Sequence, residues 1–336
     1  MPIDWQPLQK LIDAHQRFVI SSHVRPDADA IGSEQGLAKY LISLGKSVRI
    51  INPSPSPPNL TFLDPDNEIQ IIGRDVTIES ACETDVHFVV DTSAWQQLLE
   101  VGDALKQSRA RKVVIDHHVS ADDLGAMEFK DTSAAATGVL ITEFLEFVKA
   151  DLTAPQATAL YCAIATDTGW FRFSNVDART MHCAASLIEQ GVRPHHVYRE
   201  LYERSSLSRL KLHSVVLGRV EQSYAGKLTH SFVSLKDFRQ TGAQPSDTEE
   251  LVNICLTIEG TEAAFLLVEQ PDGRVKASIR SRSRVDVASV AEQFGGGGHR
   301  QAAGAMLDGP IEAAQSSLIK AFAQQLSPED SKLVAE

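Results

Sequence analysis

Lys112-Val113-Val114-Ile115-Asp116-His117-His118 combines a short apolar run with a polar triplet at its end. Three apolar residues lead directly into one carboxylate and two imidazoles. A continuous apolar run is typical of a strand buried on both faces of a parallel sheet, and open sheets of this kind bind ligands at the carboxyl ends of their strands. The stretch therefore predicts a buried strand that delivers polar side chains to a ligand site.

Three further apolar segments also end in acidic or histidine side chains. A predicted strand over residues 17–22 is followed by His23, Asp27 and Asp29. A predicted strand over residues 86–90 ends at Asp91, and a predicted helix over residues 155–165 runs into Asp167. Because the carboxyl ends of parallel strands meet at one edge of a sheet, we expect these side chains to converge with the triplet.

The alternation of strands and helices through about residue 190 predicts an α/β fold with a doubly wound parallel sheet. After residue 190 the pattern changes to two helices, at 193–204 and 206–221, and then to strands at 228–235, 263–269, 275–280 and 303–307. We predict four segments: a catalytic domain (1–190), a helical connector (191–222), a smaller α+β substrate-binding domain (223–326) and a tail (327–336). The substrate cleft is expected between the two domains.

Composition narrows the class of protein. The chain has 336 residues, 43% of them hydrophobic and 23% charged, as in globular proteins of two ordinary domains. Its net charge of −12 argues against a protein that binds long duplex nucleic acid, since such proteins carry a basic face. A small phosphorylated ligand in a locally basic pocket remains compatible with that charge.

The location is also constrained by the sequence. Its start lacks a basic region followed by an apolar run, and its apolar runs are shorter than the roughly 20 residues that span a bilayer, so we expect neither a secretory signal nor a membrane partner. The four cysteines are scattered without CxxC spacing and are expected to be reduced thiols of a cytoplasmic protein. The oligomeric state, including a homodimer, is left open.

The acidic residues have simpler interpretations one by one. Asp29 or Asp91 could cap a following helix, and Asp167 could be a solvated turn residue. Together with Asp27 and Asp116, however, they would place five carboxylates at one sheet edge, where they cannot all stay ionised without a counter-charge. Two divalent cations would supply that charge, and mixed imidazole and carboxylate ligands suit Mn²⁺ best, with Mg²⁺, Co²⁺ and Zn²⁺ as alternatives.

A second motif lies near the carboxyl end of the chain. Four consecutive glycines permit a close backbone approach to a ligand, and basic side chains lie immediately after them and just before them. The candidate substrate-binding residues are Arg280, Arg282, Gly296, Gly297, Gly298, His299 and Arg300. A flexible glycine linker and an edge strand with a solvated arginine face, which would include Arg284, are the alternatives.

Taken as a set, these motifs resemble those of the DHH phosphoesterase superfamily over residues 15–307. The resemblance implies one metal held by His23, Asp27 and Asp91. It implies a second metal held by Asp29, Asp91, His117 and Asp167, with Asp91 bridging the two. His118 would then face the substrate phosphate, and Asp116 would lie behind the metal ligands or face the substrate; both are candidate catalytic residues.

The glycine-rich stretch resembles the DHH-associated C-terminal domain of nanoRNases and pAp phosphatases. This implies hydrolysis of short oligoribonucleotides, linear dinucleotides or 3′-phosphoadenosine 5′-phosphate. Manganese-dependent inorganic pyrophosphatase and cyclic-dinucleotide phosphodiesterase are alternatives within the superfamily, and a non-catalytic nucleotide or single-stranded RNA binding protein is an alternative of another class. One departure is that many relatives have an arginine shortly after the Asp91 position, where this chain has Ala94-Trp95-Gln96-Gln97.

Overall fold

The computed structural model describes residues 3–282 and 284–326. The chain divides into two compact units, Met1–Arg204 and Ser205–Glu336, which we call the N-terminal and C-terminal units. The helices α8 (Pro194–Tyr202) and α9 (Leu207–Leu217) of the predicted connector fall in different units. The domain limits given above stay predictions, and the predicted tail, residues 327–336, lies outside the described residues.

The N-terminal unit is built on a sheet of six parallel strands in the order β3-β2-β1-β4-β5-β6. The strands are β1 (Arg17–Ser21), β2 (Ser47–Asn52), β3 (Ile69–Ile71), β4 (Val86–Val90), β5 (Arg111–Asp116) and β6 (Met127–Lys130). The chain order reverses between β1 and β4, and open α/β sheets bind ligands outside the strand ends at such a switch point. The predicted doubly wound parallel sheet is confirmed.

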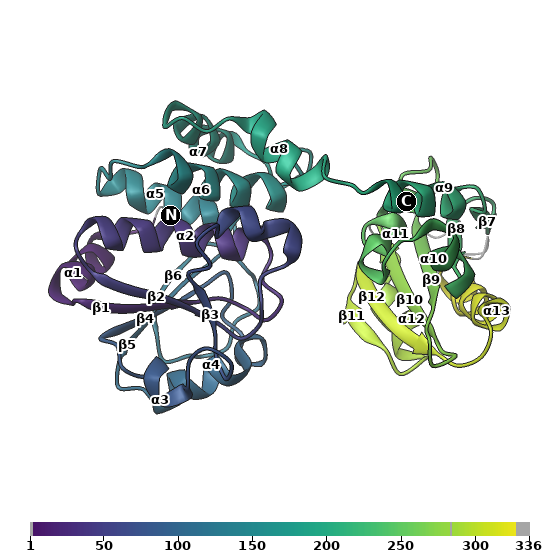
Figure 1. Ribbon diagram of the computed structural model, residues 1–336, viewed down its shortest axis with the longest axis horizontal. Coiled ribbons are helices and arrows are strands. Elements are labelled where there is room, and N and C mark those ends of the chain that lie inside the picture. The colour runs from purple at the N-terminus through teal and green to yellow at the C-terminus, as the bar shows by residue number, and fades with distance from the viewer. Residues whose placement is uncertain (1–2, 283, 327–336) are drawn as a thin grey trace, which may run out of the picture. The chain divides into compact units, whose positions relative to one another are not determined.

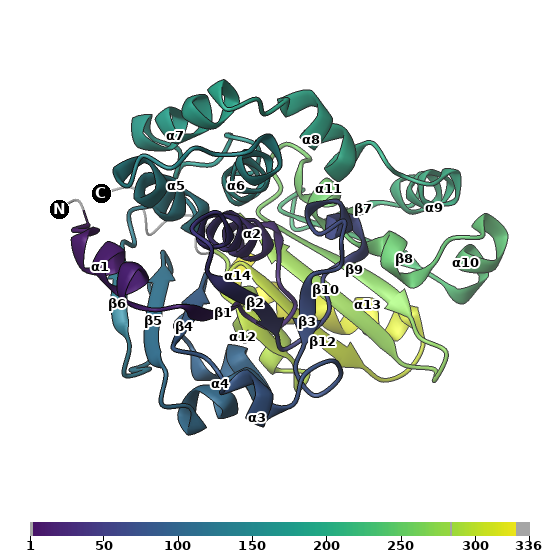
Figure 2. The ribbon, with the colours of Figure 1, turned by 60° about the vertical axis from the view of Figure 1, so that its left-hand side comes forward.

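Helices cover both faces of this sheet, as Figures 1 and 2 show. They are α1 (Gln6–Ala14), α2 (Ala28–Ser43), α3 (Ile78–Ala81), α4 (Trp95–Gln107), α5 (Thr137–Phe147) and α6 (Ala154–Asp167). The helices α7 (Ala178–Glu189) and α8 lie outside these layers, with α7 packed on α5 and α6. One core joins Phe18 and Phe88 to α2, α5 and α6, and the opposite core joins Val19 and Val89 to α3 and α4. Every residue of β4 is buried, His87 included.

The C-terminal unit has a mixed sheet in the order β11-β12-β10-β9-β8-β7. Its elements are β7 (Glu221–Ser223), β8 (Leu228–Val233), α10 (Leu235–Thr241), α11 (Leu251–Leu256), β9 (Ala263–Glu269), β10 (Val275–Ser281), α12 (Val287–Glu292), β11 (Gly297–His299), β12 (Ala302–Leu307), α13 (Ile311–Ala321) and α14 (Ala323–Leu326). The helices α12 and α13 share a core with one face, and α9 and α11 share a core with the other. The predicted α+β class of this unit is confirmed.

The structure corrects several local predictions. The short strand β6 and the helices α7, α10 and α11 were not predicted from the sequence. The strand β10 lies between β12 and β9, so the edge-strand interpretation is wrong for Arg280, while Arg282 and Arg284 follow the end of β10. The glycine run is no free linker, because Gly297 and Gly298 pair with β12 as part of β11.

Candidate active site

The candidate site lies at the carboxyl ends of β1, β4 and β5, which are neighbours in the sheet. His23 follows β1, Asp91 follows β4, and His117 follows β5. Asp91 adopts a left-handed backbone conformation with φ 61°, which is strained for a residue with a side chain. Its amide donates to the carbonyl of Ile115 at 3.0 Å, so the turn after β4 is fixed against β5.

His23 forms the first group with two carboxylates. Its Nε2 lies 3.5 Å from Oδ2 of Asp91 and 3.9 Å from Oδ1 of Asp27. Its Nδ1 lies 3.0 Å from the carbonyl of Val24, which accepts a hydrogen bond if Nδ1 carries the proton. That arrangement leaves Nε2 as a metal-binding nitrogen aimed at the carboxylates.

His117 forms the second group, on the other side of Asp91. Its Nδ1 is 3.1 Å from the carbonyl of Ala134, and its Nε2 faces three carboxylates. The distances from Nε2 are 3.4 Å to Asp167, 3.6 Å to Asp91 and 3.8 Å to Asp29. Asp91 presents Oδ2 to His23 and Oδ1 to His117, so it stands between the two groups.

Asp29 and Asp91 are held by the start of α5. The amides of Thr137 and Gly138 donate to the two oxygens of Asp29 at 2.7 and 2.8 Å, and the Thr137 hydroxyl donates to Asp91 at 2.9 Å. The amino end of a helix attracts negative charge, so α5 orients both carboxylates. Sequence reasoning missed Thr137 because this contact joins segments 108 residues apart.

The capping interpretations are resolved by the same geometry. The residue that caps α2 is Asp27, whose Oδ1 accepts from the amides of Asp29 and Ala30. Asp29 instead lies in the first turn and contacts α5, so the interpretation of Asp29 as the cap is wrong. Asp91 does not cap α4, because the N-cap position there is Ala94.

His118 is oriented by the first residue of the triplet. Its Nδ1 lies 2.9 Å from Oδ1 of Asp116, and its backbone amide donates to the same oxygen at 3.0 Å. The His118 side chain is 46% exposed, whereas that of Asp116 is fully buried. Asp116 therefore lies behind His118, and the alternative in which it faces the substrate does not fit this geometry.

The carboxyl pKa values show that this site fits divalent cations. Burial, with the charges of neighbouring carboxylates, raises the pKa of Asp29 and of Asp91 well above the ordinary value. The same two causes raise the pKa of Asp167 to about 8. Acidic groups packed in this way need a counter-charge to ionise together, and bound cations supply it. The donor set of imidazole and carboxylate groups suits Mn²⁺, Zn²⁺ or Mg²⁺.

Potential metal ligands gather in three overlapping groups, each with donor atoms within 4.8 Å of one another. The groups are His23, Asp27 and Asp91; Asp29, His117 and Asp167; and Asp91, His117 and His118. All six predicted metal ligands are included, and His118 joins them at the exposed side. The structure thus brings together the N-terminal residues that the sequence singled out.

The predicted substrate-binding residues lie at one end of the C-terminal sheet. Arg280 on β10 and His299 on β11 both pair with Ala302 of β12, so their side chains point to the same face. Lys276 and Met306 are exposed on this face, and Arg280 is half-buried. The remaining basic side chains, Arg282 and Arg300, are exposed just beyond the strands.

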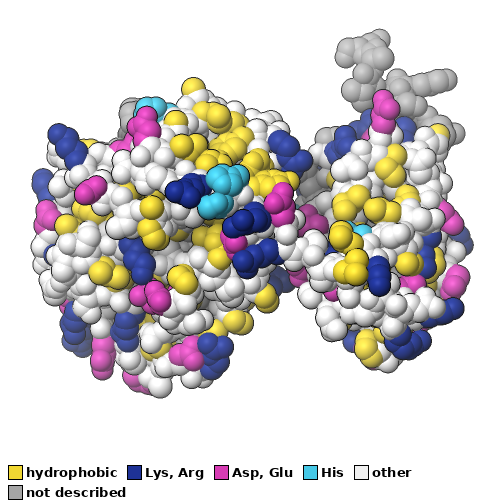
Figure 3. Space-filling view, turned by 45° about the horizontal axis from the view of Figure 1, so that its top comes forward, with side chains coloured by type: hydrophobic (Ala, Val, Ile, Leu, Met, Phe, Trp, Pro, Cys, Tyr) yellow, Lys and Arg dark blue, Asp and Glu magenta, His cyan; other side chains and the backbone are white. Residues whose placement is uncertain are grey.

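Two glycines of this motif are required by the close packing of the sheet. A Cβ atom on Gly296 would lie 2.2 Å from the carbonyl oxygen of Gly304, and one on Gly298 would lie 2.5 Å from that of Ala302. Both positions therefore need glycine because β12 approaches closely. Gly297 has open space around it and is exposed. The surface of Figure 3 shows Lys and Arg side chains interspersed with Asp and Glu.

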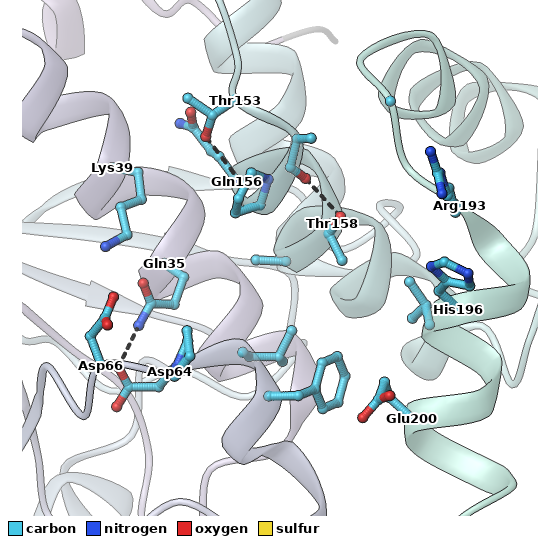
Figure 4. A pocket seen from close by; sticks show the side chains of 18 of the residues that line it. Gln35, Lys39, Asp64, Asp66, Thr153, Gln156, Thr158, Arg193, His196 and Glu200 are labelled. Carbon is cyan, nitrogen blue, oxygen red and sulfur yellow. Dashed lines mark hydrogen bonds between the residues drawn. The ribbon is translucent and has the colours of Figure 1, made fainter.

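A separate hollow of about 810 Å³ lies in the N-terminal unit between α2, the segment 62–68, α6 and α8. Figure 4 shows Gln35 and Asp64 joined by a hydrogen bond on one side and His196 with Glu200 on the other. The described residues that line it include none of the six predicted metal ligands. It is therefore distinct from the site at the strand ends.

Comparison with known proteins places the chain in a family. Residues 17–165 match the DHH family, N-terminal domain, and residues 225–327 match the DHHA1 domain. A Thermus thermophilus protein, named bifunctional oligoribonuclease and PAP phosphatase NrnA, is 30% identical over 92% of this chain and 90% of its own. The chain belongs to the DHH family. A Bacillus subtilis protein with the same name as the Thermus thermophilus relative is 29% identical over 89% of this chain and 92% of its own.

Two further similar proteins extend the comparison. The cyclic-di-AMP phosphodiesterase PdeA of Listeria monocytogenes is 28% identical over 94% of this chain, but over 49% of its own length. The crystal structure of an exopolyphosphatase-related protein from Bacteroides fragilis superposes with a TM-score of 0.88 at 26% identity, covering 96% of this chain and 97% of that one. The resemblance drawn from the motifs is confirmed. Among the described residues, no helix is long and apolar enough to cross a membrane.

Proposed function

We propose that this chain is a two-metal phosphoesterase that hydrolyses short oligoribonucleotides to mononucleotides and 3′-phosphoadenosine 5′-phosphate to AMP. The observation that carries the proposal is the position of Asp91, which faces His23 with one oxygen and His117 with the other. A carboxylate shared by two ligand groups is suited to contact two neighbouring cations with its two oxygens. The names of the 27–30% identical NrnA relatives support the substrates.

The six predicted ligands would hold the cations. His23, Asp27 and Asp91 would hold one cation, and Asp29, His117 and Asp167 would hold the other together with the shared Asp91. Divalent cations held there, for which we propose Mn²⁺, would neutralise these carboxylates and lower the pKa of a bound water, so that a nucleophile is available at neutral pH. His118 keeps Nδ1 on Asp116, so Nε2 is the ring nitrogen left for the substrate. In the imidazolium form, with both nitrogens protonated, Nε2 would donate a hydrogen bond to a phosphate oxygen or a proton to the leaving oxygen.

The substrate would be held by the exposed basic face of the C-terminal unit. Arg280 and His299 project from the same face of the sheet, and Arg282 and Arg300 lie at its end. Guanidinium groups bind phosphate oxygens in a bidentate manner, so this surface suits the backbone of a short nucleotide chain. The free cysteines, of which Cys162, Cys183 and Cys255 are buried, support a cytoplasmic location.

A substrate panel at fixed Mn²⁺ tests the proposal. The panel contains pAp, pApA, RNA of two to about twenty nucleotides, cyclic-di-AMP and pyrophosphate. We expect turnover of pAp and the shortest RNAs, with loss in EDTA and recovery with Mn²⁺. A dominant activity on pyrophosphate or on cyclic-di-AMP would contradict the proposed substrates. Binding of RNA without any turnover would favour a non-catalytic binding protein.

A substitution at the shared carboxylate tests the metal arrangement. Asp91→Ala should abolish turnover while the protein remains folded, because it removes a ligand from both sets. Asp103→Ala is the matched control, since Asp103 lies on α4 with its side chain 56% exposed. Substantial Mn²⁺-dependent turnover by the Asp91 variant would contradict the two-metal site.

A further inference from the structure

Lys130, at the end of β6, is a largely buried cation beside the triplet. Its side chain is 14% exposed, and its Nζ lies 3.2 Å from Oδ2 of Asp116. The same ammonium donates to Oγ of Ser93 at 2.8 Å and to the carbonyl of Ser120 at 2.9 Å. The ammonium group thus makes two hydrogen bonds and a close ion pair with Asp116.

The contact follows from the pairing of two strands. Asp116 of β5 and Lys130 of β6 are partners in the parallel register, which places their side chains near each other on one face of the sheet. Ser93 links the pair, because its hydroxyl accepts from Lys130 and donates to Oδ2 of Asp116 at 2.7 Å. A buried carboxylate thus has a buried positive partner and a hydroxyl bridge.

The other oxygen of Asp116 is the one that holds His118. Oδ1 accepts from the His118 amide at 3.0 Å and lies 2.9 Å from the His118 Nδ1. With Oδ2 fixed by Lys130 and Ser93, the carboxylate cannot rotate without breaking contacts at both oxygens. A carboxylate that is fixed at one side orients the imidazole bound at its other side.

Lys130 also anchors the segment that follows the triplet. Its bond to the Ser120 carbonyl fixes the chain just after His118, and the amide of Asp122 donates to the Ser93 carbonyl at 2.8 Å. The neighbouring side chain of Val119 is 87% exposed, so this segment has little burial of its own to hold it. The ammonium group therefore links β6 to the turn after β4 and to the backbone after His118.

We propose that Lys130 is a positioning residue that fixes the His118 ring through Asp116. Its action is indirect: Lys130 contacts Asp116, Ser93 and Ser120, and it is Asp116 that contacts His118. The kinetic part of this inference rests on the proposed phosphoesterase function. The simpler alternative is that Lys130 only neutralises a buried carboxylate and contributes stability without affecting the ring.

A double-mutant cycle separates these two roles. The variants are Lys130→Met, which keeps an unbranched side chain only one atom shorter and removes the charge, His118→Ala, and the two combined. We expect Lys130→Met to lower kcat on pAp by about 10–100-fold with KM within about threefold, as for loss of a group that orients a catalytic side chain. In the His118→Ala background the same change should alter kcat less than about threefold, because the ring it positions is absent.

Matched measurements keep the cycle interpretable. Lys10→Met, at an exposed lysine of α1, is the control for removal of a charge. Mn²⁺ affinity, measured by calorimetry, should change less than about threefold in Lys130→Met, and Lys130→Arg should recover part of kcat. An equal loss of kcat from Lys130→Met with and without His118 would overturn the proposal.

A spectroscopic arm tests the positioning without any turnover. In ¹⁵N-labelled, Mg²⁺-loaded protein, the His118 ring should show a single tautomer with its proton on Nδ1, and Lys130→Met should give mixed or exchange-broadened ring signals. An unchanged tautomer and line width in the variant would overturn the proposal. If the wild-type protein hydrolysed none of the panel, the proposed function would fail while this arm still decided the role of Lys130.

Discussion

Replacing Asp167 by asparagine should stabilise the metal-free protein while weakening its response to metal. Burial and the charges of Asp29 and Asp27 raise the pKa of Asp167 from 3.8 to about 8. At pH 7 the unfolded carboxyl is ionised and the folded carboxyl is protonated, so folding must take up a proton. The asparagine of the variant is neutral in both states and avoids that cost.

The size of the effect follows from the two pKa values of Asp167. Neutral pH lies about 3 units above the ordinary pKa, and each unit corresponds to about 1.4 kcal/mol, which gives an upper bound of about 4 kcal/mol. The side chain is 31% exposed, so solvent reduces this to about 3 kcal/mol. An imperfectly bonded buried amide costs about 1 kcal/mol. We expect a net gain of about 2 kcal/mol in the free energy of unfolding.

The sign of the pH dependence provides a second check. Between pH 3.8 and about 8 the folded state binds more protons at Asp167 than the unfolded state does. The contribution of Asp167 therefore lowers the stability of the wild-type protein as pH rises through this window. Since the asparagine variant lacks this contribution, its gain in the free energy of unfolding over the wild-type protein should be small near pH 4 and largest near pH 8.

Urea unfolding in EDTA at several pH values measures this difference, with the exposed Asp103→Asn as the control. With saturating Mn²⁺ the wild-type protein should become the more stable of the two, because it would gain more binding energy than a variant lacking one ligand. An Asp167→Asn protein that is less stable than wild type in EDTA at pH 8 would refute the reasoning. So would a gain that does not change between pH 5 and pH 8.

The remaining predictions concern the core, the helix contact and the C-terminal surface. Burial lowers the pKa of His87 from 6.5 to about 3. Between these pH values the unfolded state binds a proton that the folded state does not, so the free energy of unfolding should fall as pH drops from about 6.5 towards 3. In acid unfolding curves, His87→Gln should remove several kcal/mol of this loss. A Cβ atom on Gly138 would lie 2.7 Å from Cβ of Ala163 and 3.3 Å from Oδ1 of Asp29, so Gly138→Ala should cost about 1–3 kcal/mol in urea unfolding and weaken Mn²⁺ binding in calorimetry. Unchanged Mn²⁺ affinity in Gly138→Ala would show that the contact of α5 with Asp29 does not affect metal binding. Arg280→Ala should raise KM for dinucleotides about tenfold or more while kcat and Mn²⁺ affinity stay close to wild type; a loss confined to kcat would contradict a binding role.

Much of the site could be predicted because its strands carry strong local signals. The run before Asp116 is continuously apolar, and the run before Asp91 is apolar apart from His87. They form β5 and β4, which are largely and fully buried. A parallel sheet places such strand ends at one edge whatever their distance in the chain, so convergence of the polar residues followed from the fold class alone. Residues that follow these strongly apolar strands were therefore found.

The contacts that orient those residues carry no comparable local signal. Lys130 lies on a strand of four residues, too short for its alternation to be distinguished from a loop, and its role depends on the register with β5. Thr137 contacts Asp91 from a sequence separation of 46 residues, through a hydrogen bond that no local pattern encodes. The two residues were missed for the same reason.

The sequence by itself determined the residue types of the site and the strands that carry most of them. Apolar runs must be buried, and the polar residues at their ends then lie where the backbone leaves the sheet. Tertiary structure alone decided that Asp27 caps α2 while Asp29 contacts α5, and that Asp116 stands behind His118. Those roles depend on strand register and on helix ends brought together from distant parts of the chain, and both are fixed by packing after the local elements have formed.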